Sequence, residues 1–303
     1  GCSVSAGIPS GGMITWEFKK RLYCEKHDIN VEKFQDLESE RNRSILQGHF
    51  NDLSGYPSYG DKDEYSFYFE KYFPKSIDRK CFFQEKVNNA NPTIGHKSFG
   101  QLIVSRRVDS VFTTNFDELL ESGIKAINPS ESFIVFTPDN VHQIDKLRKS
   151  SYPKIIKLHG DYRYDKLKNT GDETQRLDSE LNKYFSEILL EKGLIVLGYS
   201  GNDESIMKAL REASTKVDSF PFGLIWCIRK GDKPRDEIIQ FVEEINKKNN
   251  LSGFLEVDAS DEFLYNLYES SDEGGNATLN SLGADIFKKK LKFSLKQAKQ
   301  SKA

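Results

Sequence analysis

Residues Leu194–Asp203, LIVLGYSGND, have the pattern of a buried strand that ends in a turn of small residues. The run of four apolar residues at its start shows no alternation, which is typical of a strand covered on both faces of a parallel sheet. Open α/β sheets bind their ligands at the carboxyl ends of such strands. We therefore expect Gly198, Tyr199 and Ser200 to line a ligand site. We expect Asp203 to act as the N-cap of the next helix.

Strand patterns alternate with helix patterns through most of the chain. Further strands are predicted at 109–113, 131–137, 152–158, 222–230 and 252–260, and helical patterns lie between most of them. This alternation predicts an α/β fold with a doubly wound, mostly parallel, Rossmann-like sheet. A polar and aromatic segment at about 30–95 is predicted to form a helical insertion.

The insertion contains the aromatic segment EYSFYFEKYF, residues 64–73. Aromatic side chains serve either as a helical core or as a stacking platform for nucleic acid. Basic residues are not interleaved in quantity, and the formal net charge of the chain is -2. Both observations favour aromatic packing inside the insertion.

Composition limits the class of protein. Of the 303 residues, 37% are hydrophobic and 30% are charged, and no window of roughly 18 apolar residues suits a membrane span. The cysteines, Cys2, Cys24, Cys81 and Cys227, have no C-x-x-C spacing, so the sequence predicts no zinc ribbon. A cytoplasmic protein without a membrane partner is expected.

The two ends of the chain suggest further segments. Gly1 lies within a glycine-rich turn, so we expect that a strand precedes it. Residues 1–270 are expected to form one domain. Residues 271–303 are expected to be a linker and a basic helix or tail that leads to a further domain.

Polar side chains follow two of the predicted strands. Thr114, Asn115 and Asp117 come after the strand at 109–113, and His159 comes directly after the strand at 152–158. Asp117 fits either an N-cap or a functional carboxylate. Because the carboxyl ends of parallel strands meet at one edge of a sheet, these groups are expected near Gly198 and Ser200.

The opening segment GCSVSAGIPSG leads into a helical pattern. Free N–H groups at the start of a helix suit a diphosphate, so this segment is a candidate phosphate loop.

Taken together, these motifs resemble the sirtuin superfamily across about residues 1–260. GCSVSAGIPS is similar to the end of its glycine-rich loop, TTNFD to its T-Q-N-x-D motif, LHG to its catalytic His-Gly, and GYS to its G-T/S-S turn. The cysteines of the deacylase zinc ribbon are missing. The chain is more similar to bacterial sirtuin-like domains of antiphage systems, which hydrolyse NAD without zinc and work with a STAND ATPase, a short Argonaute or a DNA translocase.

The resemblance implies that NAD is the substrate and that no other cofactor is needed. It implies His159 as general base and Asn115 as the group that orients water or ribose. It implies that Asp117 either positions Asn115 or approaches the nicotinamide amide. NAD contacts are implied for Gly1, Cys2, Ser3, Gly7, Ile8, Pro9, Thr114, Gly198, Tyr199, Ser200, Arg229 and Asp258. Loss of NAD would act as abortive infection, and a homo-oligomer is expected to control it.

Three other functions stay open at this stage. The chain could be an NAD-dependent protein deacylase, which also needs an acylated peptide. It could be a non-catalytic sensor of NAD or ADP-ribose, although a sensor does not need a base. It could also be a structural module for a partner protein.

Overall fold

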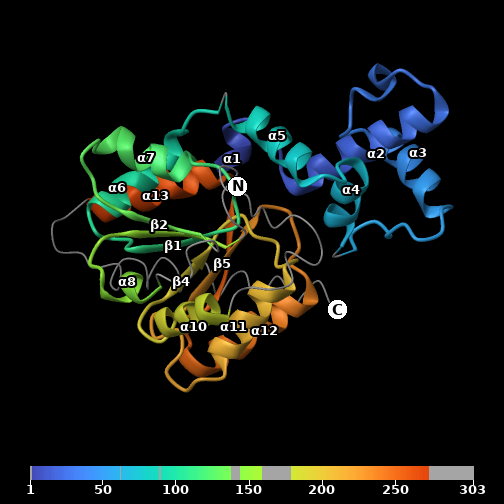
Figure 1. The fold of residues 1–303 in the computed structure, drawn as a ribbon. Coiled ribbons are helices and arrows are strands. Elements are labelled where there is room, and N and C mark those ends of the chain that lie inside the picture. Colours follow the sequence, from blue (N-terminus) through green and yellow to red (C-terminus); the bar gives the residue numbers. More distant parts are fainter. Residues whose placement is uncertain (1, 62, 89, 138–143, 159–178, 273–303) are drawn as a thin grey trace.

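The computed structural model describes residues 2–61, 63–88, 90–137, 144–158 and 179–272. Within them the chain forms two three-stranded parallel sheets, with helices on both faces (Figure 1). The first sheet has the order β1-β3-β2 and the second has the order β4-β5-β6. The strands are β1 (Ser110–Thr113), β2 (Ile134–Phe136), β3 (Lys154–Lys157), β4 (Leu194–Val196), β5 (Leu224–Arg229) and β6 (Gly253–Val257). The predicted α/β, parallel, Rossmann-like class is confirmed.

Each face of the two sheets has its own layer of helices (Figure 1). One layer contains α6 (Ile94–Val104), α7 (Leu119–Ile127) and α13 (Ser260–Asp272). The other contains α8 (Ile144–Lys149), α10 (Ser179–Ile188), α11 (Glu204–Ser214) and α12 (Asp236–Asn249). One hydrophobic core joins Phe136 and Ile156 of the first sheet to Trp226 and Phe254 of the second. The two sheets are therefore held by a shared helical layer.

Two glycines let α6 and α7 approach closely. A Cβ atom on Gly100 would lie 2.7 Å from the carbonyl oxygen of Gly123, and one on Gly123 would lie 2.4 Å from that of His96. No side chain fits at either distance. This packing fixes the start of α7, and with it the loop that carries Asn115 and Asp117.

A separate helical module projects to one side of the sheets (Figure 1). It comprises α2 (Gly11–His27), α3 (Glu40–Asn51), α4 (Glu64–Tyr72) and α5 (Ser76–Val87). Phe18, Phe69 and Phe83 belong to its buried core, and Phe69 lies within 6 Å of both other rings. The predicted aromatic packing of the insertion is confirmed, and α2 belongs to the same packed unit.

The module also buries a cation. Lys19 is fully buried, and its Nζ lies 4.5 Å from the ring centre of Trp16 and 4.9 Å from that of Tyr68. It forms an ion pair with Glu64, which supplies the opposite charge. Rings and carboxylate together compensate the loss of water around the ammonium group.

Between the two sheets, the strand order is interrupted. Strands β1 and β4 are each the edge of their own sheet. Their amino ends are joined by a salt bridge of 2.9 Å between Asp109 and Lys192. The sequence predicted one sheet; the described residues form two, because none of their strands pairs with both β1 and β4.

Candidate functional site

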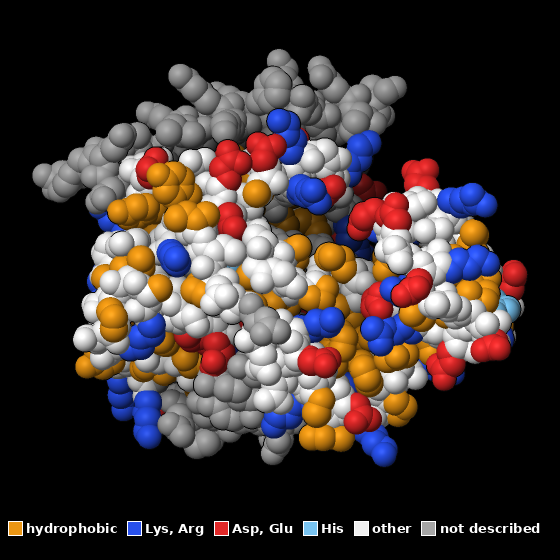
Figure 2. Space-filling model, turned by 90° about the horizontal axis from the view of Figure 1, so that it is seen from above, with side chains coloured by type: hydrophobic (Ala, Val, Ile, Leu, Met, Phe, Trp, Pro, Cys, Tyr) orange, Lys and Arg blue, Asp and Glu red, His pale blue; other side chains and the backbone are white. Residues whose placement is uncertain are grey.

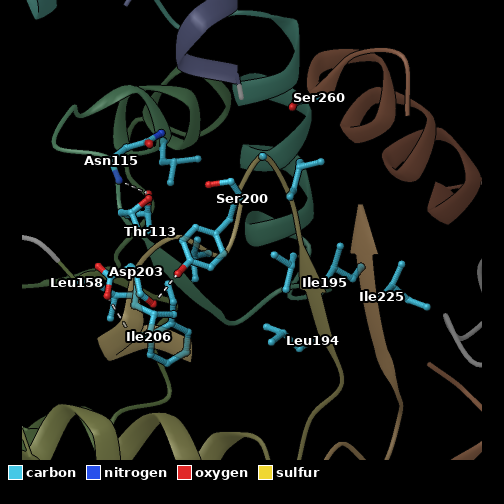
Figure 3. Close-up of a pocket in the computed structure, with 18 of the residues that line it drawn as sticks. Thr113, Asn115, Leu158, Leu194, Ile195, Ser200, Asp203, Ile206, Ile225 and Ser260 are labelled. Carbon is cyan, nitrogen blue, oxygen red and sulfur yellow. Dashed lines mark hydrogen bonds between the residues drawn. The ribbon is translucent and has the colours of Figure 1, made fainter. Parts of the chain in front are cut away.

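A large pocket of about 2220 Å³ lies along the facing edges of β1 and β4 and extends toward the helical module. Figure 2 shows a hollow in this face of the molecule, with hydrophobic side chains gathered around it. In Figure 3, Asn115 and Thr113 come from one wall, and Ser200 comes from the turn beyond β4. The carboxyl ends of both strands therefore face one cavity.

On the first wall, Asn115, Ser3 and Asp117 form a chain of hydrogen bonds. Asn115 Nδ2 donates to Ser3 Oγ at 2.7 Å, and Ser3 Oγ donates to Asp117 Oδ2 at 2.8 Å. Ser3 and Asp117 are buried, whereas Asn115 is exposed to the pocket. Because its amide nitrogen is held by Ser3, Asn115 presents Oδ1 as an acceptor to a ligand.

The network depends on the short helix α1 (Cys2–Ser5), which brings Ser3 to the carboxyl end of β1. Ala6 and Ile8 donate their backbone N–H groups to Ser3 O, at 3.1 and 2.9 Å. These bonds fold the opening segment back on itself. The hydroxyl proton of Ser3 is directed to Asp117, so this hydroxyl does not donate to an NAD diphosphate while that bond is formed.

Asp117 is fixed at three points. Its Oδ1 accepts from Leu119 N at 3.0 Å, its Oδ2 accepts from Ser3, and its backbone oxygen accepts from Lys157 Nζ at 2.7 Å. Glu118 occupies the N-cap position of α7, so the first contact comes from the residue before the cap. The structure therefore does not give Asp117 the N-cap position, and its carboxylate lies in the pocket wall.

Lys157 supports this loop from inside the protein. It is fully buried on β3 and forms a salt bridge of 2.8 Å with Glu121 of α7. A buried ammonium group requires such partners, and here they also hold the backbone of Asp117. Thr113 adds a second support, because its Oγ1 accepts from Asn115 N at 3.0 Å.

The second wall is the turn after β4. Gly198 and Gly201 have φ values of 68° and 78°, in the left-handed region that favours glycine. Tyr199 points inward: its ring packs on Trp226, and its hydroxyl donates to Asp203 O at 3.2 Å. Burial raises the pKa of Tyr199, so the phenol stays neutral. Ser200 is exposed.

The predicted cap of α11 is confirmed. Asp203 Oδ1 accepts from Ser205 N at 2.9 Å and from Ile206 N at 3.2 Å. These two N–H groups are therefore not available to an anion.

The structure brings together most of the predicted site residues that it describes. The pocket is lined by Ser3, Ile8, Pro9, Thr114, Asn115, Asp117, Gly198, Tyr199 and Ser200. Gly7, Arg229 and Asp258 do not line it, and Asp258 lies 3.6 Å from Lys230 in an ion pair. Gly1 and His159 lie outside the described residues, as does the side chain of Cys2.

Sequence reasoning missed Thr113, Glu121 and Lys157. Lys157 could have been recognised from the sequence, because this charged residue interrupts the apolar strand pattern two positions before His159. In the part of the chain that is described, no group of three or more His, Cys, Asp and Glu side chains is placed to hold a metal ion. No described helix is both long and apolar enough to cross a membrane.

Residues 109–250 match the family model of the SIR2-like domain. This part of the chain is similar to the SIR2-like domain, which is consistent with a member of the sirtuin-like superfamily. The matched segment contains Asn115, Asp117 and the turn after β4, and it begins beside β1. A comparison with curated proteins found no match. SIR2-like domains suggest a function related to NAD.

Proposed function

We propose that this protein is an NAD hydrolase that cleaves the bond between nicotinamide and ribose. The observation that carries the proposal is the chain of hydrogen bonds from Asn115 through Ser3 to Asp117, which opens into a pocket of a SIR2-like domain. This arrangement presents an oriented amide at the carboxyl end of a parallel strand, where a nucleotide is expected.

In the proposed reaction, the C–N bond between ribose and nicotinamide breaks. Nicotinamide leaves with the electron pair and becomes neutral, so its departure needs little acid catalysis. Water adds to the cationic ribose carbon and loses a proton, and the products are nicotinamide and ADP-ribose. His159 is proposed as the base that accepts this proton, since a neutral imidazole near pH 7 suits that task.

Asn115 is proposed to orient the water or a ribose hydroxyl through Oδ1. Ser3 and Asp117 hold its amide in one orientation, which raises the fraction of molecules in a reactive geometry. The backbone of the opening segment and the turn from Gly198 to Ser200 are proposed to bind the diphosphate and the adenosine ribose. No zinc or other cofactor enters the proposed reaction.

The test is chromatography of NAD incubated with the purified protein in the absence of any peptide. We expect conversion to nicotinamide and ADP-ribose. We expect Asn115→Ala and His159→Ala to reduce the rate by roughly 100- to 10,000-fold, the range for loss of acid–base chemistry. The control is Asn266→Ala, at an exposed position of α13. A native rate in either site variant would refute these assignments.

The same assay separates the alternative functions. A deacylase would leave NAD intact until an acylated peptide is added. A sensor would bind NAD or ADP-ribose, seen by calorimetry, without turnover. Either result would replace the proposed function.

We further propose that NAD loss serves antiphage defence by abortive infection, with a STAND ATPase, a short Argonaute or a DNA translocase as the sensing partner. Uncontrolled NAD hydrolysis would harm the cell, so assembly into a homo-oligomer is proposed to control it. Full activity in a dilute monomer, measured after size-exclusion chromatography, would contradict this control.

A further inference from the structure

Asn202 lies on the second wall of the pocket, in the turn after β4. It is exposed and lines the pocket next to Asp203, which Figure 3 labels on the same turn. The backbone of Asn202 is fixed on both sides. A Cβ atom on Gly201 would lie 2.5 Å from Cδ1 of Ile238, so the turn packs directly on α12. On the other side, Asp203 is the N-cap of α11. Both neighbours therefore hold Asn202 at the pocket.

The side-chain amide of Asn202 has one orientation. Arg235 Nη1 donates a hydrogen bond to Asn202 Oδ1 at 2.8 Å. A guanidinium group carries only donors, so it can face the oxygen of an amide but not its nitrogen. Nδ2 of Asn202 is therefore directed away from Arg235, and within the described part of the chain it donates to no acceptor. Asn202 thus offers the pocket a hydrogen-bond donor.

Arg235 is itself held at the start of α12. It occupies the N-cap position, and its backbone oxygen accepts from Ile238 N at 2.9 Å and from Ile239 N at 3.0 Å. Its Nη2 lies 3.8 Å from Glu237 Oε2, and the same oxygen lies 3.8 Å from Arg211 Nη2 of α11. Exposed ion pairs of this kind contribute little to stability. Here they limit the positions of the guanidinium group beside the turn.

Two amides with opposite hydrogen-bonding roles therefore line one pocket. Asn115, on the first wall, presents Oδ1 as an acceptor because its nitrogen is held by Ser3. Asn202, on the second wall, presents Nδ2 as a donor because its oxygen is held by Arg235. In the proposed reaction the bond that breaks lies beside Asn115, so the other half of the dinucleotide extends toward the turn after β4. That half is adenosine, which offers acceptors in its ring nitrogens and ribose oxygens.

We propose that Asn202 binds the adenosine half of NAD by donating from Nδ2 to an adenine ring nitrogen or a ribose oxygen. Arg235 is then a positioning residue, which acts on the ligand only through Asn202. Because Nδ2 only donates, Asn202 does not recognise the 6-amino group of adenine, which is itself a donor. This inference rests on the proposed function, and it adds to it the group that selects the adenosine half.

The alternative is a surface contact that only joins the turn to α12. Replacement of Asn202 would then change the unfolding midpoint and leave the affinity for a ligand unchanged. Asn202→Asp separates the two roles. A carboxylate at position 202 still accepts from Arg235, so the surface contact is kept, but it has no N–H group to give to a ligand.

The test measures binding of ADP-ribose and of ADP by calorimetry, and kcat and KM for NAD by chromatography. We expect Asn202→Ala and Arg235→Met each to weaken binding of both ligands by about 5- to 10-fold, the effect of one lost hydrogen bond, and Asn202→Asp to weaken it at least as much. KM for NAD is expected to rise by the same factor with kcat unchanged. The double variant Asn202→Ala/Arg235→Met is expected to bind no more weakly than Asn202→Ala, since Arg235 acts through Asn202. Lys233→Ala, at an exposed position before α12, is the control.

Native affinity in Asn202→Ala or in Asn202→Asp would overturn the proposal. A loss of affinity for ADP-ribose but not for ADP would overturn it too, because it would place Asn202 at the other ribose. Additive losses in the double variant would overturn the positioning role of Arg235. If the native protein leaves NAD intact but binds ADP-ribose in a way that depends on Asn202, the proposed hydrolysis fails and this inference stands. Turnover of NAD with KM unchanged in the variants would have the reverse meaning.

Discussion

The hydroxyl of Ser3 donates a hydrogen bond to Asp117 at 2.8 Å, although 114 positions separate the two residues in the sequence. The bond joins the opening segment of the chain to the loop after β1. The same carboxylate accepts from Leu119 N, the first residue of α7, at 3.0 Å. Asp117 thus links local helix geometry to the position of Asn115 on the pocket wall.

Replacement of Ser3 by alanine tests this link. Ser3→Ala removes the group that receives Asn115 Nδ2, so the amide of Asn115 loses its fixed orientation. We expect NAD turnover to fall by up to about 100-fold, the cost of a misplaced catalytic group, with binding of NAD less affected. The measurement is kcat and KM by chromatography. Ser5→Ala, at an exposed position of the same helix, is the control, and equal rates for the two variants would contradict the link.

Asn115→Asp tests whether residue 115 must donate the hydrogen bond to Ser3. The new carboxylate cannot donate to Ser3, and it places a negative charge near Asp117. We expect turnover to fall by at least about 100-fold, with little change in the unfolding midpoint because Asn115 is exposed. Turnover and thermal unfolding are measured on the same sample. A large drop in the unfolding midpoint would instead show that Asn115 stabilises the folded state.

Much of the fold could be predicted because its signals are local. The uninterrupted apolar run before Gly198 predicted β4, and Asp203 predicted the start of α11, since a cap acts within three residues. The gap between β1 and β4 could not be predicted, because strand neighbours are decided by contacts between distant segments. The short α8 was also missed, because six residues give too little periodicity.

The site could be predicted only in part, for the same reason. Small and polar residues after strands indicated Asn115, Asp117 and Ser200, which line one pocket. The support from Lys157 depends on two neighbours, Asp117 O and Glu121, that no spacing rule connects to it. Arg229 was predicted only from its place at a strand end. It is exposed outside the pocket, because strand position does not determine which way a side chain points.

Lys157→Met tests the buried support beneath the site. The change leaves Glu121 as a buried charge without its cation, and loss of one partner of a buried pair costs about 3–5 kcal/mol. Urea unfolding measures the loss. Lys154→Met, on the same strand but only half-buried, is expected to cost much less. Equal effects of the two changes would show that the pair does not stabilise the loop.

Asp203→Ala tests the cap of α11. Two N–H groups, those of Ser205 and Ile206, lose their acceptor, and loss of an N-cap costs about 1 kcal/mol. Asp203→Asn keeps an acceptor oxygen and is expected to retain most of the stability. Thermal unfolding of both variants is compared with Asp218→Ala, an exposed control outside any helix. A native midpoint for Asp203→Ala would show that the cap contributes little.

His96 is expected to make stability depend on pH. It is 1% exposed at the start of α6, and its Nδ1 accepts from Thr93 N at 3.2 Å. Burial lowers its pKa below 6.5, against the opposing charges of Asp117 and Asp261. The unfolded chain therefore binds a proton near pH 6.5 while the folded chain does not. The stability that buried, neutral His96 contributes is therefore fully present above pH 6.5 and is lost as the pH falls below that value.

The measurement is urea unfolding of the native protein and of His96→Gln between pH 7.5 and pH 5. Carboxylates also titrate in this pH range, and they do so in both proteins. The informative quantity is therefore the difference in unfolding free energy between the native protein and His96→Gln at each pH. We expect the native protein to lose more stability than His96→Gln as the pH falls, because only the native protein must remove a proton from His96 to bury the imidazole at the start of α6. His27→Gln, at an exposed position of α2, is expected to follow the native protein. Parallel curves for the native protein and His96→Gln would show that another group sets the pH dependence.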